Sequence, residues 1–500
     1  MPILAGWLTG EQVSHEILGQ TLTTMGTMLG QHGGQPAQIV QPGMGLITFS
    51  DPAHTMQYND EPPVLDWVPD RRTFVYRRPL SGAHVLYYIE NWPAQGNLLF
   101  ASEIKALLAV GAPRHIHFTA LDALLRYGFI PAPWTAFKNI SVVPAGSILR
   151  WQRAKTVVNH ATDFHLDEPS SSDDAIDQLH DLLSKAVVDM LPPHEQLVAL
   201  VDESSSSALA ALLTARHTTT TFTIAAFSYK KRKNRTAVQV AEVCQRPFLA
   251  VTGVNQPEFW VATLAGLESP SVDTRPLALH QLLHTVANET GARVAISGLG
   301  ANVLQGRFPT SAAEISRIFS HDALQQMKQE EPWEETLHAR KLLRRAEQFR
   351  DENQRQYYLD LHLRLPDHIV SMTHQLAMQE GMAVRSPYLR SDVMNMMTCL
   401  PTVLSDGTRK SDLFSVLVSR SFPNLKDGQV DKPLDMPMTS LLHVKDSELL
   451  RQTLALEVLQ ATGIFDPRTV EDLLRQKEVS RELVLVFTTQ LLCQLFGASL

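Results

Sequence analysis

Two short polar loops hold the residues of this chain that are best suited to chemistry. The first, residues 201–207 (VDESSSS), follows an apolar run and precedes a helical pattern; the second, residues 297–306, follows another apolar run and contains three glycines. Hydroxyl and backbone N–H groups at the start of a helix bind anions or cap the helix, and capping is the more common role. Glycines after a strand let a backbone approach phosphate, although most of them only form turns.

Alternating strand and helix patterns must position these two loops. Apolar spacing predicts a helix over 173–190 and, after it, four strands and three helices. The strands are expected at 197–201, 219–227, 248–252 and 293–296, and the helices at 208–216, 235–244 and 276–290. Such alternation predicts a parallel, doubly wound sheet, in which ligands bind outside the carboxyl ends of the strands. From about residue 310 onward the pattern is helical.

The N-terminal third follows a different pattern. Its first 45 residues are rich in Gly and Gln and weakly patterned, and strand-like runs then occur at 45–49, 73–76, 85–89 and 98–101. Turn residues between these runs predict a mainly antiparallel domain with helices at 102–109 and 119–127. Residues 163–174 combine five acidic residues, three serines and a proline without apolar periodicity, which is typical of a linker. We therefore predict two domains, residues 1–165 and 173–500.

Composition excludes several classes of protein. The 500 residues are 44% hydrophobic and 19% charged, as in a globular protein, and the net charge of −8 argues against binding nucleic acid through bulk positive charge. The three cysteines are far apart and form no disulfide framework, which favours the cytoplasm. No apolar run is long enough to span a membrane, and the N-terminus lacks signal-peptide features.

Three further features carry weaker expectations. The basic run 230–235 (KKRKNR) is expected to be a solvated loop, and an anion-binding patch is the less favoured alternative. His280 and His284 are one helical turn apart without an evident third ligand, so no metal site is expected. The apolar stripe in 482–496 predicts a buried helix or, alternatively, a face between subunits.

Segments in 98–146 resemble the asparagine synthetase B family, the glutamine-hydrolysing branch of a superfamily that includes β-lactam synthetases. The matching segments are LLFASEIKALLA at 98–109, YGFIPAP at 127–133, FKNI at 137–140, VPAG at 143–146 and VRSPYL at 384–389. The resemblance implies a fold in two parts, of mixed α/β and α+β class. A truncated Ntn-hydrolase-like glutaminase domain would precede an ATP-pyrophosphatase-like (adenine nucleotide alpha hydrolase) parallel-sheet domain with a helical C-terminal part.

The chain departs from this family where charge chemistry is expected. The glutaminase nucleophile would be a cysteine at position 2, where this sequence has Pro2, which has no nucleophilic side chain. The family loop SGGLDSS aligns with 201–207, so two glycines become Asp202 and Glu203 and the metal-binding aspartate becomes Ser205. Carboxylates beside a polyphosphate repel it by roughly 1–4 kcal/mol per charge pair at about 4 Å.

The second loop has lost its acidic residues but kept its glycines. The family sequence SGDGADELFGG implies acidic residues at the positions of Leu299, Asn302 and Val303. The remnant of the nucleotide loops would then comprise residues of both segments: Asp202, Glu203, Ser204, Ser205, Ser206, Ser207, Ser297, Gly298 and Gly300. Lys410 and Lys432 are the residual catalytic candidates, because they align with two lysines of the family.

These departures predict a degenerate family member, an asparagine synthetase-like pseudoenzyme that needs no cofactor. It would act as a non-catalytic scaffold or regulatory subunit that pairs with an active paralogue, another complex or itself. The first alternative is an ATP-dependent amide-forming ligase of β-lactam synthetase or lasso-peptide-cyclase type, which would use ATP and Mg²⁺ to form an acyl-adenylate. The second alternative is a small-anion or metabolite sensor that uses the turn at 204–207.

Overall fold

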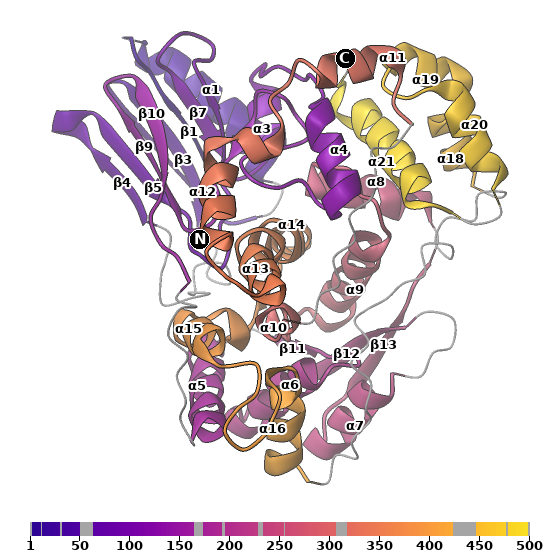
Figure 1. Cartoon of the computed structure of the whole chain (residues 1–500). Helices are drawn as coiled ribbons and strands as arrows, with labels where there is room; N and C mark the ends of the chain where they lie inside the picture. The colour runs from indigo at the N-terminus through magenta and orange to yellow at the C-terminus, as the bar shows by residue number, and fades with distance from the viewer. Residues whose placement is uncertain are drawn as a thin grey trace.

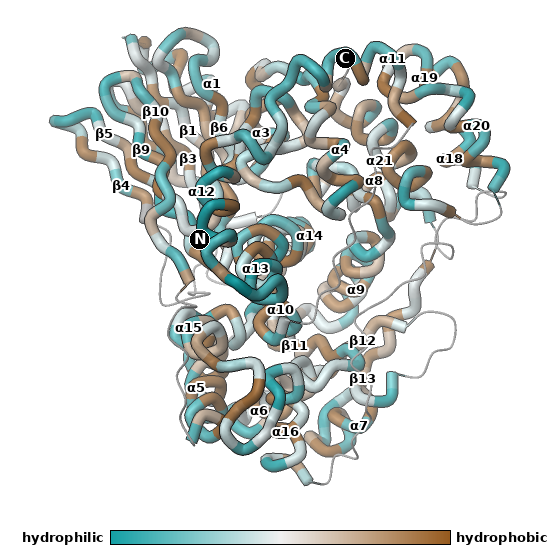
Figure 2. Tube along the Cα trace, viewed as in Figure 1, coloured by the Kyte–Doolittle hydropathy of each residue, from teal (hydrophilic) through white to brown (hydrophobic). Residues whose placement is uncertain are grey.

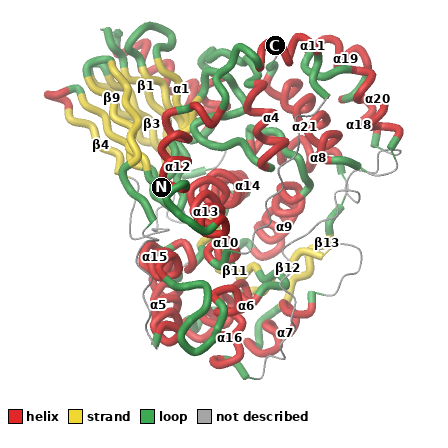
Figure 3. Tube along the Cα trace, in the orientation of Figure 1, coloured by secondary structure: helices red, strands yellow, loops and turns green. Residues whose placement is uncertain are grey.

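The computed structural model contains two antiparallel sheets, one parallel sheet and many helices (Figures 1 and 3). It describes residues 3–11, 13–30, 33–50, 64–164, 174–192, 196–228, 234–254, 256–306, 318–423, 447–476 and 479–498. Strands occur in two regions, and Figure 3 shows them in yellow as a paired set in the N-terminal part and a smaller central set. Lys432 and most of the basic run 230–235 lie outside the described residues.

The N-terminal part is a sandwich of two antiparallel sheets. The larger sheet has the order β2-β3-β1-β7-β6-β8, and the smaller has the order β10-β9-β5-β4. Their strands are β1 (Ile3–Leu8), β2 (Gln35–Gln41), β3 (Met44–Ser50), β4 (Val64–Val68), β5 (Thr73–Arg77), β6 (Tyr87–Glu90), β7 (Leu98–Ala101), β8 (Ser141–Val142), β9 (Ser147–Gln152) and β10 (Lys155–His160). Because side chains alternate along a strand, one face of each sheet supplies the core between them. That core includes Phe74, Phe100 and Trp151.

The outer face of the larger sheet is covered by helices. These are α1 (His15–Leu29) and α3 (Ile104–Ala109), whereas α4 (Phe118–Tyr127) packs against C-terminal helices. The buried residues of α1, Leu18, Leu22, Met25 and Leu29, recur every three or four positions and therefore share one face. This face belongs to the largest core of the molecule, which continues into the C-terminal helices.

The second part is built on a parallel sheet of order β13-β12-β11-β14-β15. Its strands are β11 (Leu197–Leu200), β12 (Thr223–Ser228), β13 (Phe248–Thr252), β14 (Val294–Ser297) and β15 (Ala383–Arg385). The strand order reverses between β11 and β14, where a doubly wound sheet opens a crevice. The helices that alternate with these strands are α5 (Ala175–Met190), α6 (Ser205–His217), α7 (Arg235–Cys244), α8 (Pro257–Leu267) and α9 (Arg275–Thr290). The tube of α5 alternates between brown and teal in Figure 2, as expected for a helix with one buried face.

Helices complete the molecule from residue 301 onward. The α-helices are α10 (Ala301–Leu304), α11 (His321–Met327), α12 (Leu337–Ala346), α13 (Glu352–Leu359), α14 (Ser371–Gln379), α15 (Ser391–Cys399), α16 (Leu413–Ser421), α18 (Glu448–Thr453), α19 (Leu456–Thr462), α20 (Pro467–Arg475) and α21 (Arg481–Phe496). A π-helix, η4 (Asp360–Val370), runs into α14, and short 3₁₀ turns are η2 (Pro69–Arg71), η3 (Trp333–Glu335), η5 (Pro387–Leu389) and η6 (Lys410–Asp412).

The predicted fold class is confirmed, with antiparallel sheets before a parallel sheet and a helical C-terminal part. The stripe over 482–496 lies on α21, whose residues Leu483–Cys493 are all buried inside the chain, so its apolar face packs within the molecule. None of the helices in the described ranges combines the length and apolar composition that a membrane crossing requires.

Candidate functional site

The two predicted loops meet at the carboxyl ends of β11 and β14. A side chain at Gly298 would place its Cβ 2.8 Å from the backbone nitrogen of Ser207, so the loops are in direct contact. Beside them lies a cavity of about 230 Å³ that Asp202, Ser207, Ser297, Gly298 and Gly300 help to line. The structure therefore brings the loops 201–207 and 297–306 together where the strand order of the parallel sheet reverses, between β11 and β14.

The carboxylate of Asp202 turns back onto the start of α6. Its Oδ1 atom accepts hydrogen bonds from the backbone N–H of Ser204 (2.9 Å), from the hydroxyl of Ser207 (2.5 Å) and from the hydroxyl of Ser204. Ser204 is the N-cap of α6 and Ser207 lies in its first turn, so these donors lie at the helix end that favours anions. An internal carboxylate thus occupies the anion-binding end of α6.

The four serines act as helix-terminal and packing groups. Ser204 is the N-cap of α6, since its hydroxyl accepts a hydrogen bond from the N–H of Ser207. Ser206 is buried, and its carbonyl accepts a hydrogen bond of 2.7 Å from the hydroxyl of Tyr388. Ser205 pairs at 2.9 Å with Ser415 of α16. The hydroxyl of Ser205 is therefore directed to a neighbouring helix.

Glu203 lies apart from the cavity. One of its carboxylate oxygens accepts a hydrogen bond of 2.9 Å from the hydroxyl of Thr236, in the first turn of α7. The other oxygen is buried and has no hydrogen-bond partner among the described residues. The two acidic residues of the loop thus point to different helices, and only Asp202 lines the cavity.

The second loop contributes shape rather than charge. Gly300 has φ of +84°, a left-handed conformation, and a Cβ there would lie 2.6 Å from a methyl of Leu389. Leu299, Asn302 and Val303, the positions of the family's acidic residues, all line the cavity. This loop therefore offers no carboxylate ligand for a metal.

The remaining cavity wall is mostly apolar, with a single cationic side chain. Its apolar residues include Leu200, Val201, Phe227, Leu279, Leu282, Ile369, Met372 and Val384. The cation is Arg275, whose Nε donates a hydrogen bond of 2.9 Å to Asp273. Burial acts to raise the pKa of Asp273, but the charge and hydrogen bonds of Arg275 outweigh it and lower that pKa. This guanidinium is paired within the protein.

Lys410 lies inside the protein rather than in the cavity. Its ammonium donates a hydrogen bond of 3.3 Å to the carbonyl of Leu400 and lies 4.5 Å from the centre of the Tyr357 ring. Burial lowers the pKa of Lys410 to about 7. Lys410 does not line the cavity, and Lys432, the other lysine candidate, lies outside the described residues.

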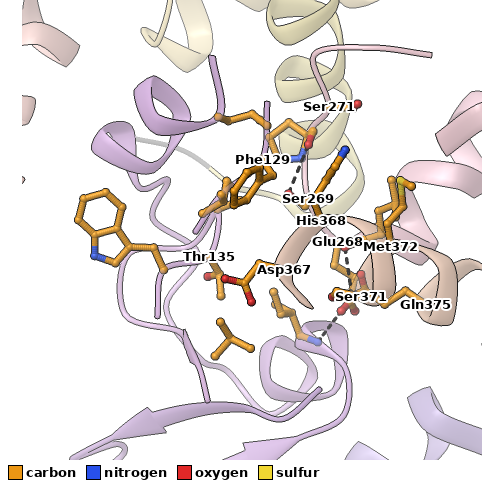
Figure 4. Close-up of a pocket in the computed structure, with 18 of the residues that line it drawn as sticks. Phe129, Thr135, Glu268, Ser269, Ser271, Asp367, His368, Ser371, Met372 and Gln375 are labelled. Carbon is orange, nitrogen blue, oxygen red and sulfur yellow. Dashed lines mark hydrogen bonds between the residues drawn. The ribbon is translucent and has the colours of Figure 1, made fainter. Parts of the chain in front are cut away.

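A second, smaller cavity lies between the two parts of the chain (Figure 4). Its volume of about 100 Å³ has room for a few water molecules. The carboxylate of Glu268 accepts hydrogen bonds from the N–H groups of Ile104 (2.6 Å) and Lys105 (2.7 Å) at the start of α3. Burial raises the pKa of Asp367 to about 6, although Arg78 lies 3.5 Å away and acts to lower it. These buried polar groups join the two parts, and burial raises the pKa of Glu268 to about 8.

Sequence reasoning missed residues that only tertiary structure brings together. Glu380 at the end of α14 bridges His280 and His284, with contacts of 2.8 and 2.9 Å to the two rings. A third group therefore does lie beside this histidine pair, contrary to the expectation. The other nitrogens of the two rings contact Thr263 and Asn288, which completes the hydrogen bonding of both.

The fold and the paired loops define a class of protein: a two-part chain with an antiparallel sandwich followed by a parallel sheet of the nucleotide-binding type. Comparison with protein families finds a glutamine amidotransferase domain over residues 66–162 and an asparagine synthase domain over residues 205–494. Because the second match spans more than half of the chain, this protein belongs to the asparagine synthetase family. No curated protein matches the chain significantly.

Proposed function

We propose that this chain is an asparagine synthetase-like pseudoenzyme, a non-catalytic scaffold or regulatory subunit. The observation that carries the proposal is the carboxylate of Asp202, which accepts hydrogen bonds from the donors that face the anion-binding end of α6. A nucleotide phosphate would have to displace this internal anion or lie beside it. At about 4 Å, two like charges repel by roughly 4 kcal/mol in the dielectric of a protein surface.

The cavity also lacks the oxygen ligands that ATP–Mg²⁺ chemistry needs. Mg²⁺ is usually held by one or two carboxylates together with substrate phosphates. Asp202 is the one carboxylate among the described lining residues, and its Oδ1 already accepts three hydrogen bonds. The volume of 230 Å³ is below the range of about 300–1,000 Å³ typical of small-molecule pockets. We therefore expect no ATP or Mg²⁺ cofactor.

The glutaminase half of the family's activity also lacks its reactive group. Acyl transfer from glutamine needs a nucleophile, which in this family is a thiol. The three cysteines, Cys244, Cys399 and Cys493, all belong to the second part of the sequence, so residues 1–165 contain none. The sandwich therefore retains an architecture without the thiol that would act in it.

A retained two-part scaffold without this chemistry fits a role in protein assembly. We propose that the chain works in the cytoplasm and pairs with an active paralogous synthetase or with a second copy of itself. Size-exclusion chromatography with light scattering, on the chain alone and mixed with a purified paralogous synthetase, tests this. A monomer that does not co-elute with the synthetase would contradict it.

The nucleotide proposal is tested by restoring the missing glycine. Titration calorimetry of the wild-type chain with Mg–ATP should show no binding, whereas Asp202→Gly, which frees the donors at the start of α6, should gain measurable binding. Glu203→Gly is the matched control: it alters the same loop, but its side chain does not line the cavity, so no gain is expected.

Two other results for the wild-type chain would overturn the proposal. Micromolar binding of Mg–ATP together with pyrophosphate release from a carboxylate substrate would favour the ligase alternative. Saturable binding of inorganic phosphate that Ser204→Ala abolishes would favour the anion sensor. Circular dichroism of each variant verifies that the fold is retained.

A further inference from the structure

A cluster of metal-binding side chains lies where the two parts of the chain meet, away from the cavity. His160 ends β10, Asp163 follows three residues later, and His362 comes from η4 of the second part. One ligand atom from each of the three residues lies within 4.8 Å of the other two. Because Asp163 and His362 are 199 residues apart, only the tertiary fold brings them together.

The hydrogen bonds of His362 orient one ring nitrogen toward the cluster. Its Nδ1 lies 2.9 Å from the carbonyl oxygen of Tyr358, which can only accept, so Nδ1 carries a proton. Its Nε2 lies 2.7 Å from Oδ1 of Asp163. In a neutral ring this nitrogen and the carboxylate oxygen are both acceptors, so they need a cation between them, either a second proton or a metal ion. A backbone carbonyl that fixes the far nitrogen is a common arrangement around metal-binding histidines.

His160 supplies a ligand that the protein does not otherwise use. Both of its ring nitrogens are buried and have no hydrogen-bond partner among the described residues. Ring nitrogens of histidine are among the usual ligands of zinc. A buried polar atom without a partner is destabilising, and a bound metal would offset that cost.

A further histidine borders the cluster. The ring of His338, on α12, lies 6.4 Å from the ring of His160, and its buried Nε2 also has no partner among the described residues. A three-ligand zinc site keeps an open position that water or another ligand fills. Because its ring lies close to that of His160, His338 is the candidate for this fourth ligand.

We propose that His160, Asp163 and His362 form a zinc site that ties the N-terminal sandwich to the synthetase-like part. Two imidazoles and one carboxylate match the donor set of zinc, whereas Mg²⁺ and Ca²⁺ prefer oxygen ligands. The sequence predicts no metal site at His280 and His284, which are one helical turn apart. That pair differs in the decisive respect, because each of its four ring nitrogens has a hydrogen-bond partner.

The test uses the full-length, tag-free chain, stripped of metal with a chelator and titrated with Zn²⁺ by calorimetry. The wild-type chain should bind one Zn²⁺, and Co²⁺ substitution should give the visible absorption of a tetrahedral site. His160→Ala and Asp163→Asn should weaken binding by about 100-fold or more, since even changes around a ligand cost roughly 10–100-fold. His284→Ala is the matched control from the second histidine–carboxylate cluster and should bind as the wild type does.

Thermal unfolding gives an independent readout that does not depend on a catalytic assay. Zn²⁺ should raise the melting temperature of the wild-type chain and of His284→Ala, because a ligand that binds only the folded state stabilises it. It should leave Asp163→Asn unchanged, and this near-isosteric variant should melt close to the metal-free wild type. Absence of saturable Zn²⁺ binding, or equal loss of binding in His284→Ala, would overturn the proposal.

Discussion

Lys410 is a basic residue whose side chain lies almost wholly inside the protein, 7% exposed. The family resemblance makes it a candidate for catalysis, but its ammonium donates to the Leu400 carbonyl and lies over the face of the Tyr357 ring. Burial disfavours the charged form and lowers the pKa of this lysine to about 7. The same burial that separates Lys410 from the cavity thus gives it an effect on stability.

This effect predicts a pH dependence. Between pH 7 and pH 10 the unfolded chain keeps a proton on Lys410 that the folded chain releases, so the stability contributed by this group rises with pH. From pH 7 to pH 9 the gain should be about 2 kcal/mol, and Lys410→Met should remove it. Urea unfolding of both proteins at the two pH values measures the difference. Equal pH dependence in both would show that Lys410 is not buried in solution.

Asp202 shows what sequence reasoning could and could not provide at this scale. The replacement of a glycine by a carboxylate is evident in the sequence, and it indicates repulsion of a phosphate. That the carboxylate would turn back and accept hydrogen bonds from Ser204 and Ser207 depends on χ angles, which sequence patterns do not report. The side chain of Glu203, one residue later, instead accepts a hydrogen bond from the hydroxyl of Thr236.

At the scale of elements, Gly298 of the second loop is explained by packing, whereas Gly300 also needs its left-handed backbone. The backbone of Gly298 is not in the left-handed conformation. A glycine is needed at this position because the start of α6 packs against it. A glycine kept for this reason persists whether or not a phosphate binds. Retention of the loop's glycines therefore reports the fold of the two loops.

A pair of alanine substitutions tests this explanation. Gly298→Ala should destabilise the protein by about 1–3 kcal/mol, because the new methyl meets the backbone at Ser207, which cannot move aside as a side chain would. Gly19→Ala, in the interior of α1 with its nearest atom 3.6 Å away, should instead stabilise by up to about 1 kcal/mol. Urea unfolding gives both values, and a neutral Gly298→Ala would contradict the close contact.

Strongly patterned elements were predictable, and elements with weak local signals were not. The helix over 173–190 and the strand over 197–201 agree with α5 and β11, because apolar spacing and β-branched runs mark them. In the first 45 residues, β1 is buried on both faces and so shows no alternation, while α1 is diluted by Gly and Thr. β15 has only three residues, and its place beside β14 is set by the sheet.

At the scale of the whole molecule, the two parts share one hydrophobic core. The largest cluster of buried residues runs from β1 and α1 through α3 and α4 to α8, α9 and α21. The rings of Phe137 and Phe496 meet edge to face across it, and Glu268 binds the start of α3. The largest core therefore continues across the predicted boundary between residues 165 and 173, although each part also has a smaller core of its own.

A shared core predicts that both parts unfold together. Differential scanning calorimetry should give one transition for the full-length chain. Glu268→Ala should lower the transition temperature, since it leaves two buried N–H groups unpaired at about 1–3 kcal/mol each, without splitting the transition. Two separate transitions in the wild-type chain would show that each part folds around its own core.

The burial of α21 has a consequence for how the protein is made. Its residues pack against α4 and α8, and the carbonyl of Phe496 accepts a hydrogen bond of 3.1 Å from Arg114. Ribosomes release the sandwich and α4 hundreds of residues before α21, yet domains usually fold as they emerge. The surface of α4 that packs against α21 therefore stays uncovered until α21 has been synthesised.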